Sequence, residues 1–173
     1  MDNVDQIYGM EQLDRALSVM AQSIEADYRE TVPLLITVMN GGLLTAGALL
    51  PKLNIVLDID YCHATRYRNT TSGHDLQWIS SPQQDIKNRD VLLVDDIFDE
   101  GITLQAIAKF CKTQGAKTVA SAVLLNKKHN RKVAGFTPDY IALDVEDRYV
   151  FGFGLDYQGR YRNAPGIFAL AEE

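Results

Sequence analysis

Residues 91–104 read Val-Leu-Leu-Val-Asp-Asp-Ile-Phe-Asp-Glu-Gly-Ile-Thr-Leu, and this stretch decides the fold class. Its first four residues form a continuous apolar run, which is typical of a strand buried on both faces of a parallel sheet. Apolar residues at helical spacing follow from Leu104 to Cys111, and Gly115 is a natural helix end. The stretch therefore predicts a strand, an acidic turn and a helix. Ligands of open α/β sheets bind at the carboxyl ends of strands, where this turn lies.

The rest of the chain shows the same alternation of strand and helix patterns. The expected helices lie at residues 10–29 and 43–50, and the expected strands at 33–39, 55–61, 118–125, 140–145 and 149–153. Residues 65–90 are polar and predict a long connection or mobile arm with room for a hairpin around Trp78. Such alternation indicates an α/β fold with a mainly parallel central sheet flanked by helices.

Length, charge and cysteine spacing exclude several classes of protein. A chain of 173 residues corresponds to a single domain over residues 1–173. The net charge of −6 counts against nucleic-acid binding, because that needs clustered lysines and arginines. Cys62 and Cys111 lack the spacing of a zinc site or a disulfide framework. The acidic start and the absence of a long apolar run lead us to expect a cytoplasmic protein that binds no membrane.

The acidic turn carries the most specific chemistry. Asp95 and Asp96 follow the apolar run directly, and Asp99, Gly101 and Thr103 come next. Helix N-termini offer unpaired amides to anions, and glycine lets the backbone approach a phosphate closely. Carboxylates beside a phosphate would repel it unless they bind a sugar diol or Mg²⁺. The pattern therefore suggests a ribose phosphate site with a metal. The alternative is that the acids only complement the helix dipole.

The stretch at 91–104 resembles the phosphoribosyl pyrophosphate (PRPP) signature of the type I phosphoribosyltransferases. From about residue 33 to 162 the chain is similar to the hypoxanthine-guanine branch of that family. The resemblance implies a transferase of purine salvage with a central parallel sheet and a mobile active-site loop at about 65–80. It also implies a small hood, formed by the N-terminal segment and about residues 126–173.

The resemblance assigns roles to the acidic turn. Asp95 and Asp96 match the pair that binds the ribose hydroxyls and the associated Mg²⁺, and Asp99 matches the proposed general base near purine N7. The residues expected to bind the ribose phosphate of PRPP are Asp95, Asp96, Asp99, Glu100, Gly101, Ile102 and Thr103. Glu100 departs from the family pattern, because threonine or serine is usual there. Phosphate binding at Glu100 must therefore rely on backbone amides and the neighbouring residues.

A second segment resembles the part of the family that binds pyrophosphate. Val38-Met-Asn-Gly-Gly42 is similar to a loop in which a non-proline cis peptide exposes amides, so Asn40 and Gly41 are expected to bind pyrophosphate. Asn40 is another departure, because lysine or arginine is usual there. Arg162 matches an arginine near the pyrophosphate. The alternative for residues 38–42 is an ordinary glycine turn at the end of a strand.

Residues 65–75 resemble the loop that closes over the active site of the family. Tyr67 matches its characteristic tyrosine, and Arg66 and Arg68 are expected to bring positive charge to the pyrophosphate. Closure would exclude water from a reacting centre with ribosyl cation character. A plain solvated loop is the alternative, since polar loops are common.

Purine recognition is expected from the C-terminal third of the chain. Lys127 aligns with the lysine that donates to the purine 6-oxo group, and Lys128, one position away, is an alternative. Tyr149 would stack on the base, and the backbone of Val150 would bind its edge. Asp156 would lie near the purine 2-position and a second metal ion.

Other basic and histidine residues are expected to be structural. The basic run at 127–132 would by itself indicate a solvated surface. His63, His74 and His129 form no ligand cluster in the sequence, and we expect them to be structural or loop residues. The metal ligands that the resemblance implies are Asp95, Asp96 and Asp156.

These expectations combine into one reaction, the Mg²⁺-dependent transfer of 5-phosphoribosyl from PRPP to N9 of hypoxanthine or guanine. The products are IMP or GMP and pyrophosphate. PRPP and a 6-oxopurine are then the partners, and the family suggests a homodimer or homotetramer. The alternatives are a xanthine-preferring or other type I phosphoribosyltransferase, and a nucleotide-sensing regulatory protein on the same fold.

Overall fold

The computed structural model describes residues 4–66 and 76–171, which form two sheets and three α-helices. The helices are α1 (Met10–Tyr28), α2 (Gly42–Leu49) and α3 (Ile102–Thr113), and a short 3₁₀ helix, η1 (Leu50–Lys52), follows α2. The strands are β1 (Val4–Gly9), β2 (Leu34–Val38), β3 (Asp58–Arg66), β4 (Leu76–Ser80), β5 (Asp90–Phe98), β6 (Thr118–Lys127), β7 (Tyr140–Val145), β8 (Val150–Phe151) and β9 (Gly166–Leu170).

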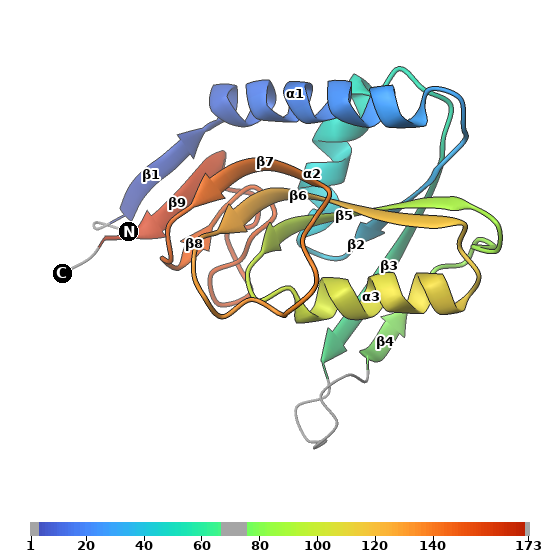
Figure 1. The fold of residues 1–173 in the computed structure, drawn as a ribbon. Coiled ribbons are helices and arrows are strands. Elements are labelled where there is room, and N and C mark those ends of the chain that lie inside the picture. The colour runs from blue at the N-terminus through green and yellow to red at the C-terminus, as the bar shows by residue number, and fades with distance from the viewer. Residues whose placement is uncertain (1–3, 67–75, 172–173) are drawn as a thin grey trace.

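The central sheet has six strands in the order β4-β3-β2-β5-β6-β7 (Figure 1). Every neighbouring pair from β3 to β7 is parallel, and the edge strand β4 pairs antiparallel with β3. The predicted α/β fold with a mainly parallel sheet is therefore confirmed. From β2 the chain moves to β3 on one side and later to β5 on the other, so the topology switches between β2 and β5. Such switch points leave a crevice at the carboxyl ends of the strands.

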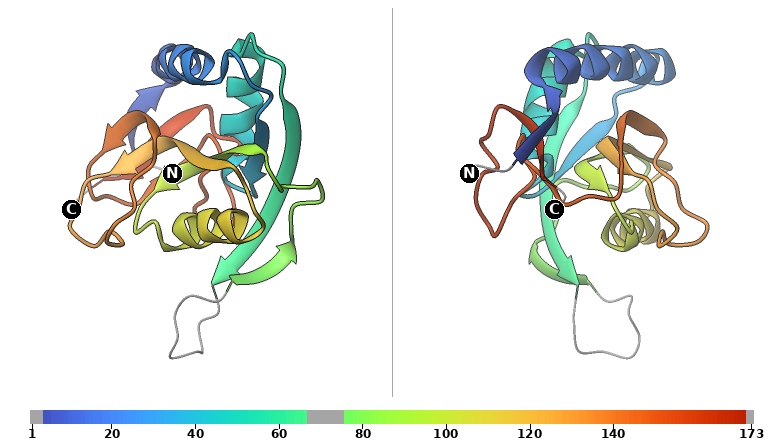
Figure 2. Two further views of the ribbon diagram at one scale, coloured as in Figure 1. Left: turned by 45° about the vertical axis from the view of Figure 1, so that its right-hand side comes forward. Right: turned by 90° about the vertical axis from the view of Figure 1, so that its left-hand side faces the viewer.

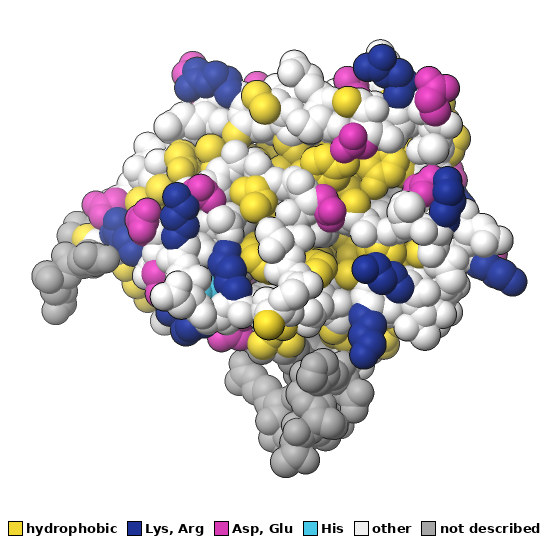
Figure 3. Space-filling view, viewed as in Figure 1, with side chains coloured by type: hydrophobic (Ala, Val, Ile, Leu, Met, Phe, Trp, Pro, Cys, Tyr) yellow, Lys and Arg dark blue, Asp and Glu magenta, His cyan; other side chains and the backbone are white. Residues whose placement is uncertain are grey.

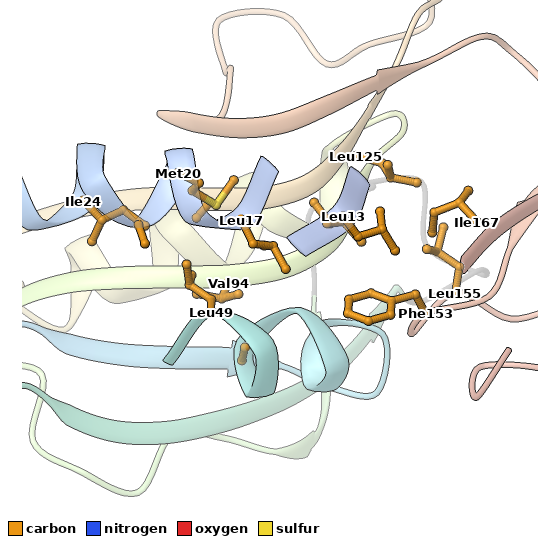
Figure 4. Packing of buried hydrophobic residues seen from close by; sticks show 14 of the residues in the cluster. Leu13, Leu17, Met20, Ile24, Leu49, Val94, Leu125, Phe153, Leu155 and Ile167 are labelled. Atoms are coloured by element: carbon orange, nitrogen blue, oxygen red, sulfur yellow. The ribbon is translucent and has the colours of Figure 1, made fainter. Parts of the chain in front are cut away.

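Helices cover both faces of the central sheet, with α1 and α2 on one face and α3 on the other (Figures 1 and 2). In β5, Leu92 and Val94 pack on the side of α1 and α2. Val91 and Leu93 alternate with them and pack on the side of α3. The apolar run therefore needs no polar position, because both faces of β5 are buried. The stripe of α1 that faces this core consists of Leu13, Leu17, Met20 and Ile24 (Figure 4).

Two predicted strands differ most from the structure in their boundaries. β3 spans residues 58–66 rather than 55–61, because its pairing with β2 begins only where Asp58 N–H donates to the carbonyl of Pro33 at 3.0 Å. β5 continues beyond the apolar run to Phe98, because β6 pairs with it as far as Asn126. The first acids of the predicted turn therefore belong to the end of a strand. Their positions are fixed by the sheet rather than by a flexible loop.

The hairpin expected around Trp78 is present. β4 pairs with β3 so that Trp78 lies opposite Ala64. The Trp78 ring packs on Phe110 of α3, with ring centroids 4.7 Å apart. This contact joins the edge of the sheet to the helix that begins at the acidic turn.

A second sheet of three strands joins the two ends of the described chain, in the order β1-β9-β8. Neither β1 nor β9 is among the strands expected from the sequence, because β1 is half polar and is ordered by pairing with a distant segment. Arg148 binds Asp5 at 2.6 Å, and the Tyr8 hydroxyl donates to the carbonyl of Asp144 at 2.6 Å. These contacts connect β1 of the second sheet to β7 and to the residues that follow it. The range 126–173, expected to contribute to a hood, includes β7, which belongs to the central sheet.

The surface carries an apolar groove between α1 and β7 (Figure 3). In the part of the chain that the structure describes, no helix is long and apolar enough to cross a membrane. Cys62 and Cys111 are buried free thiols. Burial raises the pKa of Cys62 to about 12 and that of Cys111 to about 11, so both thiols are neutral and unreactive at physiological pH.

The packing of α1 predicts a large stability difference between its two faces. Leu17 is 1% exposed, so Leu17→Ala should lower the free energy of unfolding by about 2–5 kcal/mol through lost burial and a residual cavity. Gln22→Ala on the solvent face should change it by less than about 0.5 kcal/mol. Urea denaturation of both variants measures the difference, and equal effects would contradict the assignment of the buried stripe.

Candidate active site

A cavity of about 540 Å³ opens at the carboxyl ends of the central strands, at the switch point between β2 and β5. Its volume suits a small molecule. The predicted site residues that line it are Asn40, Gly41, Asp95, Asp96, Asp99, Glu100, Gly101, Ile102, Thr103, Asp156 and Arg162. The other residues that line it are Val38, Met39, residues 63–65 of β3, Ile97, Leu104 and Arg131. Folding therefore gathers segments that are more than a hundred residues apart in sequence.

The turn after β2 is pressed against the acidic end of β5. The peptide bond between Met39 and Asn40 is cis. A Cβ atom on Gly41 would lie 1.9 Å from Asp96 Oδ2, so only glycine fits at this position. From the other side, a Cβ atom on Gly154 would lie 2.3 Å from the Gly41 carbonyl oxygen. Gly41 is thus enclosed between β5 and the loop that precedes the last strand of the second sheet.

Asp95 and Asp96 form an acidic pair in the cavity wall. Asp96 N–H donates to Asp95 Oδ1 at 2.9 Å. Burial and the negative charge of Asp96 raise the pKa of Asp95, and burial raises the pKa of Asp96 as well. The positive charge of Arg162, which pairs with Asp156, lowers both pKa values but does not outweigh burial. The two carboxylates offer the oxygen ligands that Mg²⁺ prefers, and the residues present therefore fit such an ion.

The three predicted metal ligands do not form one cluster. Within residues 4–66 and 76–171, no group of three or more acidic, histidine or cysteine side chains converges on a single point. Asp156 Oδ1 instead accepts a hydrogen bond from Arg162 Nη2 at 2.7 Å, and Asp156 Oδ2 accepts one from Gly159 N–H at 2.8 Å. Asp95 and Asp96 therefore form one candidate site by themselves. This suits Mg²⁺, which commonly takes one or two carboxylates and completes its shell with water and substrate oxygens.

The start of α3 provides amides for an anion. Gly101 caps the helix in the left-handed region at φ 80°, and a Cβ atom there would lie 2.1 Å from Phe98 Cε2. No side chain caps the helix. The first N–H groups of a helix have no partner within it, and here they belong to Ile102 and Thr103, which line the cavity. This end of the cavity is therefore suited to a phosphate.

Asp99 is held by a cation and a histidine. Lys127 Nζ donates to Asp99 Oδ2 at 2.8 Å, and His129 Nε2 lies 2.6 Å from Asp99 Oδ1. Burial by itself would raise the pKa of Asp99, but the hydrogen bonds from Lys127 and His129 outweigh it and hold the pKa below the ordinary value. Asp99 is therefore ionised at neutral pH. The contact with His129 was not expected, because the sequence gives no sign that the basic run folds back onto β5.

The remaining predicted residues lie around the second sheet. Arg162 also donates to the Gly154 carbonyl at 2.6 Å, which orders the loop beside Gly41. The Tyr149 hydroxyl donates to the carbonyl of Asp156 at 3.1 Å, and Val150 is buried in β8. Of the described residues, neither Tyr149 nor Val150 is part of the cavity lining.

The two lysines have different partners, and the closing loop is not described. Lys128 Nζ pairs with Asp144 at 3.1 Å, so Lys127 is the lysine beside Asp99. The closing-loop residues Tyr67 and Arg68, and the side chain of Arg66, lie outside the described residues.

Comparison with known proteins gives one consistent family. Residues 3–158 match the family model described as a phosphoribosyl transferase domain. The chain is 31% identical over 161 residues to the hypoxanthine-guanine phosphoribosyltransferase of Bacillus subtilis, a match that covers 92% of this chain and 89% of that protein. A crystal structure of a hypoxanthine-guanine phosphoribosyltransferase from Bacillus anthracis is 26% identical, with a TM-score of 0.92 over 98% of this chain and all of that chain. A hypoxanthine-guanine-xanthine phosphoribosyltransferase is 26% identical, with a TM-score of 0.89 over 99% of this chain and all of that chain.

The raised pKa of Asp95 predicts a stability difference that depends on pH. The folded protein retains a proton that the unfolded chain releases, so this group costs stability as pH rises from about 4, the ordinary aspartate pKa, through the folded pKa. Asp95→Asn removes the charge and keeps an acceptor for Asp96 N–H. In the presence of a chelator, the variant should melt above the wild type at neutral pH, and the gap should shrink toward pH 4.

Thermal denaturation across this pH range tests the effect. Glu30→Gln is the matched control, because Glu30 is exposed and its replacement should leave the pH dependence unchanged. Equal melting temperatures of Asp95→Asn and wild type at neutral pH would contradict the raised pKa.

Proposed function

The chain belongs to the phosphoribosyltransferase family, in its hypoxanthine-guanine branch, and on this premise we propose that it transfers 5-phosphoribosyl from PRPP to N9 of hypoxanthine or guanine. The reaction requires Mg²⁺ and gives IMP or GMP and pyrophosphate. The observation that carries the proposal is the pairing of Asp99 with Lys127 at the edge of the cavity. A carboxylate beside an ammonium complements a 6-oxopurine, in which the N7 proton is donated and the 6-oxo oxygen accepts.

In this mechanism Lys127 turns from Asp99 to the 6-oxo oxygen when the purine enters. The freed oxygen of Asp99 then receives or shares the proton of N7, as a general base. Lys127 selects against a 6-amino group, because an ammonium can only donate hydrogen bonds. Its present contact with Asp99 keeps both side chains ordered before the base binds.

The ribose phosphate of PRPP occupies the end of the cavity at α3. Backbone amides at Ile102 and Thr103, with the Thr103 hydroxyl, bind the 5′-phosphate. Asp95 and Asp96 accept hydrogen bonds from the ribose hydroxyls and hold Mg²⁺, which when bound neutralises charge on the ribose pyrophosphate. The carboxylate of Glu100 replaces the usual hydroxyl donor, so the phosphate depends on the helix amides.

The leaving pyrophosphate binds at the turn after β2. Asn40 and Gly41 present this turn to the cavity, and Arg162, which also lines the cavity, binds the Gly154 carbonyl beside Gly41. Because the reacting carbon develops positive charge, the protein contributes mainly by orienting the reactants and stabilising the leaving anion. Arg66 and Tyr67 are proposed to close over this end and exclude water.

The second sheet is proposed to act as a hood over the purine. Tyr149 stacks on the base, the backbone of Val150 binds its edge, and Asp156 lies near the 2-position and a second metal ion. The hydrogen bond from Tyr149 to the backbone of Asp156 supports this grouping. The proposal includes a cytoplasmic location, with which the buried free cysteines agree, and a homodimer or homotetramer.

A xanthine-preferring enzyme is the second candidate, favoured by the similarity to a hypoxanthine-guanine-xanthine phosphoribosyltransferase. A nucleotide-sensing regulatory protein is less well supported, because the general base Asp99 is present and the net charge of −6 opposes RNA binding.

A competition assay with PRPP and Mg²⁺ tests the function. Hypoxanthine, guanine, xanthine and adenine are supplied together, and the nucleotides formed are separated and measured. The proposal expects IMP and GMP as the main products. Mainly xanthosine monophosphate would support the second candidate, and turnover of adenine alone would overturn the role of Lys127.

The role of Asp99 predicts a selective loss of turnover. Asp99→Asn keeps the size and one acceptor oxygen but removes the base, so kcat should fall by about 10²- to 10⁴-fold with a much smaller change in KM. Steady-state kinetics with hypoxanthine measure the effect. Asp85→Asn, at an exposed position outside the cavity lining, should keep wild-type kinetics. Near wild-type turnover of Asp99→Asn would refute the role as base.

The role of Lys127 predicts a change in purine preference. Lys127→Met removes a charge-assisted hydrogen bond worth about 1.5–3 kcal/mol, so kcat/KM for hypoxanthine should fall by roughly 10- to 100-fold. The discrimination against adenine should weaken at the same time. Lys128→Met is the comparison, because Lys128 pairs with Asp144 and should leave the preference intact. The opposite result for the two lysines would transfer the role to Lys128.

A further inference from the structure

His129 is the one partner of Asp99 to which the proposed mechanism gives no task. Its ring lies 2.6 Å from Asp99 Oδ1, on the opposite carboxylate oxygen from Lys127. The His129 side chain is 3% exposed, whereas that of Asp99 is 42% exposed. The histidine therefore lies behind the carboxylate, and the carboxylate faces the cavity.

A backbone contact fixes the tautomer of His129. The N–H of Arg131 donates to His129 Nδ1 at 3.0 Å. A ring nitrogen that accepts a hydrogen bond carries no proton, so the proton of the neutral ring is on Nε2. Nε2–H then donates to Asp99 Oδ1. The contact with Arg131 thus occupies Nδ1 and leaves Nε2–H to serve Asp99.

The loop that carries His129 is anchored at several points. Lys128 N–H donates to the carbonyl of Val145 at 2.8 Å, and Val133 N–H donates to the carbonyl of Glu100 at 2.8 Å. The guanidinium of Arg131 binds both oxygens of Asp147 at 2.7 Å. These contacts tie the loop to the end of β7 and to the residue that follows Asp99. The donor on His129 is therefore held at a fixed distance from the carboxylate it serves.

We infer that His129 is a positioning residue, whose Nε2–H holds Asp99 Oδ1 so that Asp99 Oδ2 faces N7 of the bound purine. The inference rests on the proposed function, because it needs Lys127 to leave Asp99 for the 6-oxo oxygen. Once Lys127 leaves, His129 is the side chain that still binds Asp99, of the two that bind it among the described residues. The terminal torsion of an aspartate has broad minima, so an unheld carboxylate rotates. A misplacement of about 1 Å at a reacting group costs up to roughly 10²-fold in rate.

An imidazole N–H suits this task better than a second lysine. It leaves the charge of Asp99 available to the N7 proton, and it supplies no ammonium that would compete with Lys127 for the 6-oxo oxygen. The hydrogen bond also helps to keep the pKa of Asp99 below its ordinary value, so the carboxylate is ionised before the purine arrives.

Two substitutions at His129 and one at its neighbour test the inference. His129→Leu removes the donor with little change in volume. His129→Gln places an amide N–H near the position of Nε2–H. Asn130→Ala, at the exposed next residue, is the control. For each protein we measure kcat, both KM values, the melting temperature, and the pKa of Asp99 by carboxyl NMR without substrates.

We expect the loss of the His129 donor to lower turnover and to leave substrate binding nearly unchanged. His129→Leu should lower kcat by about 10- to 100-fold with little change in either KM, and it should raise the pKa of Asp99. His129→Gln should recover most of the turnover and the low pKa, and Asn130→Ala should match the wild type. Full kcat in His129→Leu would overturn the inference.

A second outcome would also overturn it, namely equal losses in the Leu and Gln variants that follow the melting temperature, because packing alone would then explain them. A wild-type protein without transferase activity would overturn the proposed function and this role together. An active wild type with an unimpaired His129→Leu variant would overturn only the role of His129.

Discussion

The contact between Gly41 and the Asp96 carboxylate is the constraint on which the site depends. The parallel pairing of β2 with β5 places the turn after β2 directly against the acids at the end of β5. The absence of a side chain at Gly41 lets the two segments approach, and the absence of one at Gly154 lets the second sheet close on the same turn. One position thus joins the acidic pair, the cis turn and the loop that carries Asp156.

Two cations of the site form ion pairs with carboxylates, and a ligand can take the place of one partner in each pair. Lys127 binds Asp99 and Arg162 binds Asp156, while Asp96 N–H donates to Asp95 and the charge of Arg162 acts on both of these acids. Burial makes the acidic pair costly to ionise, which favours the binding of a cation there. The net charge of −6 is therefore compatible with an anionic substrate, because helix amides and a divalent ion can hold the phosphates.

Local sequence was enough to predict the helices and strands that are marked by a short apolar run or by apolar residues at helical spacing. The run at 91–94 predicts β5 because both of its faces are buried, and the spacing in residues 10–29 predicts α1. β1 could not be predicted in this way, because it is half polar and it forms its strand hydrogen bonds with β9, more than 150 residues later. Strand ends are equally nonlocal, since β5 extends to Phe98 only because β6 pairs with it.

The sequence by itself determined the α/β class, the acidic segment at residues 95–103 and the family resemblance, since each depends on neighbours along the chain. Only the tertiary structure decided which residues meet. It placed His129 and Lys127 on Asp99, Lys128 on Asp144, and Arg162 on Asp156. The physical reason is that these contacts join the ends of different strands, and sheet order and loop anchoring, rather than spacing in the chain, set the distances between them.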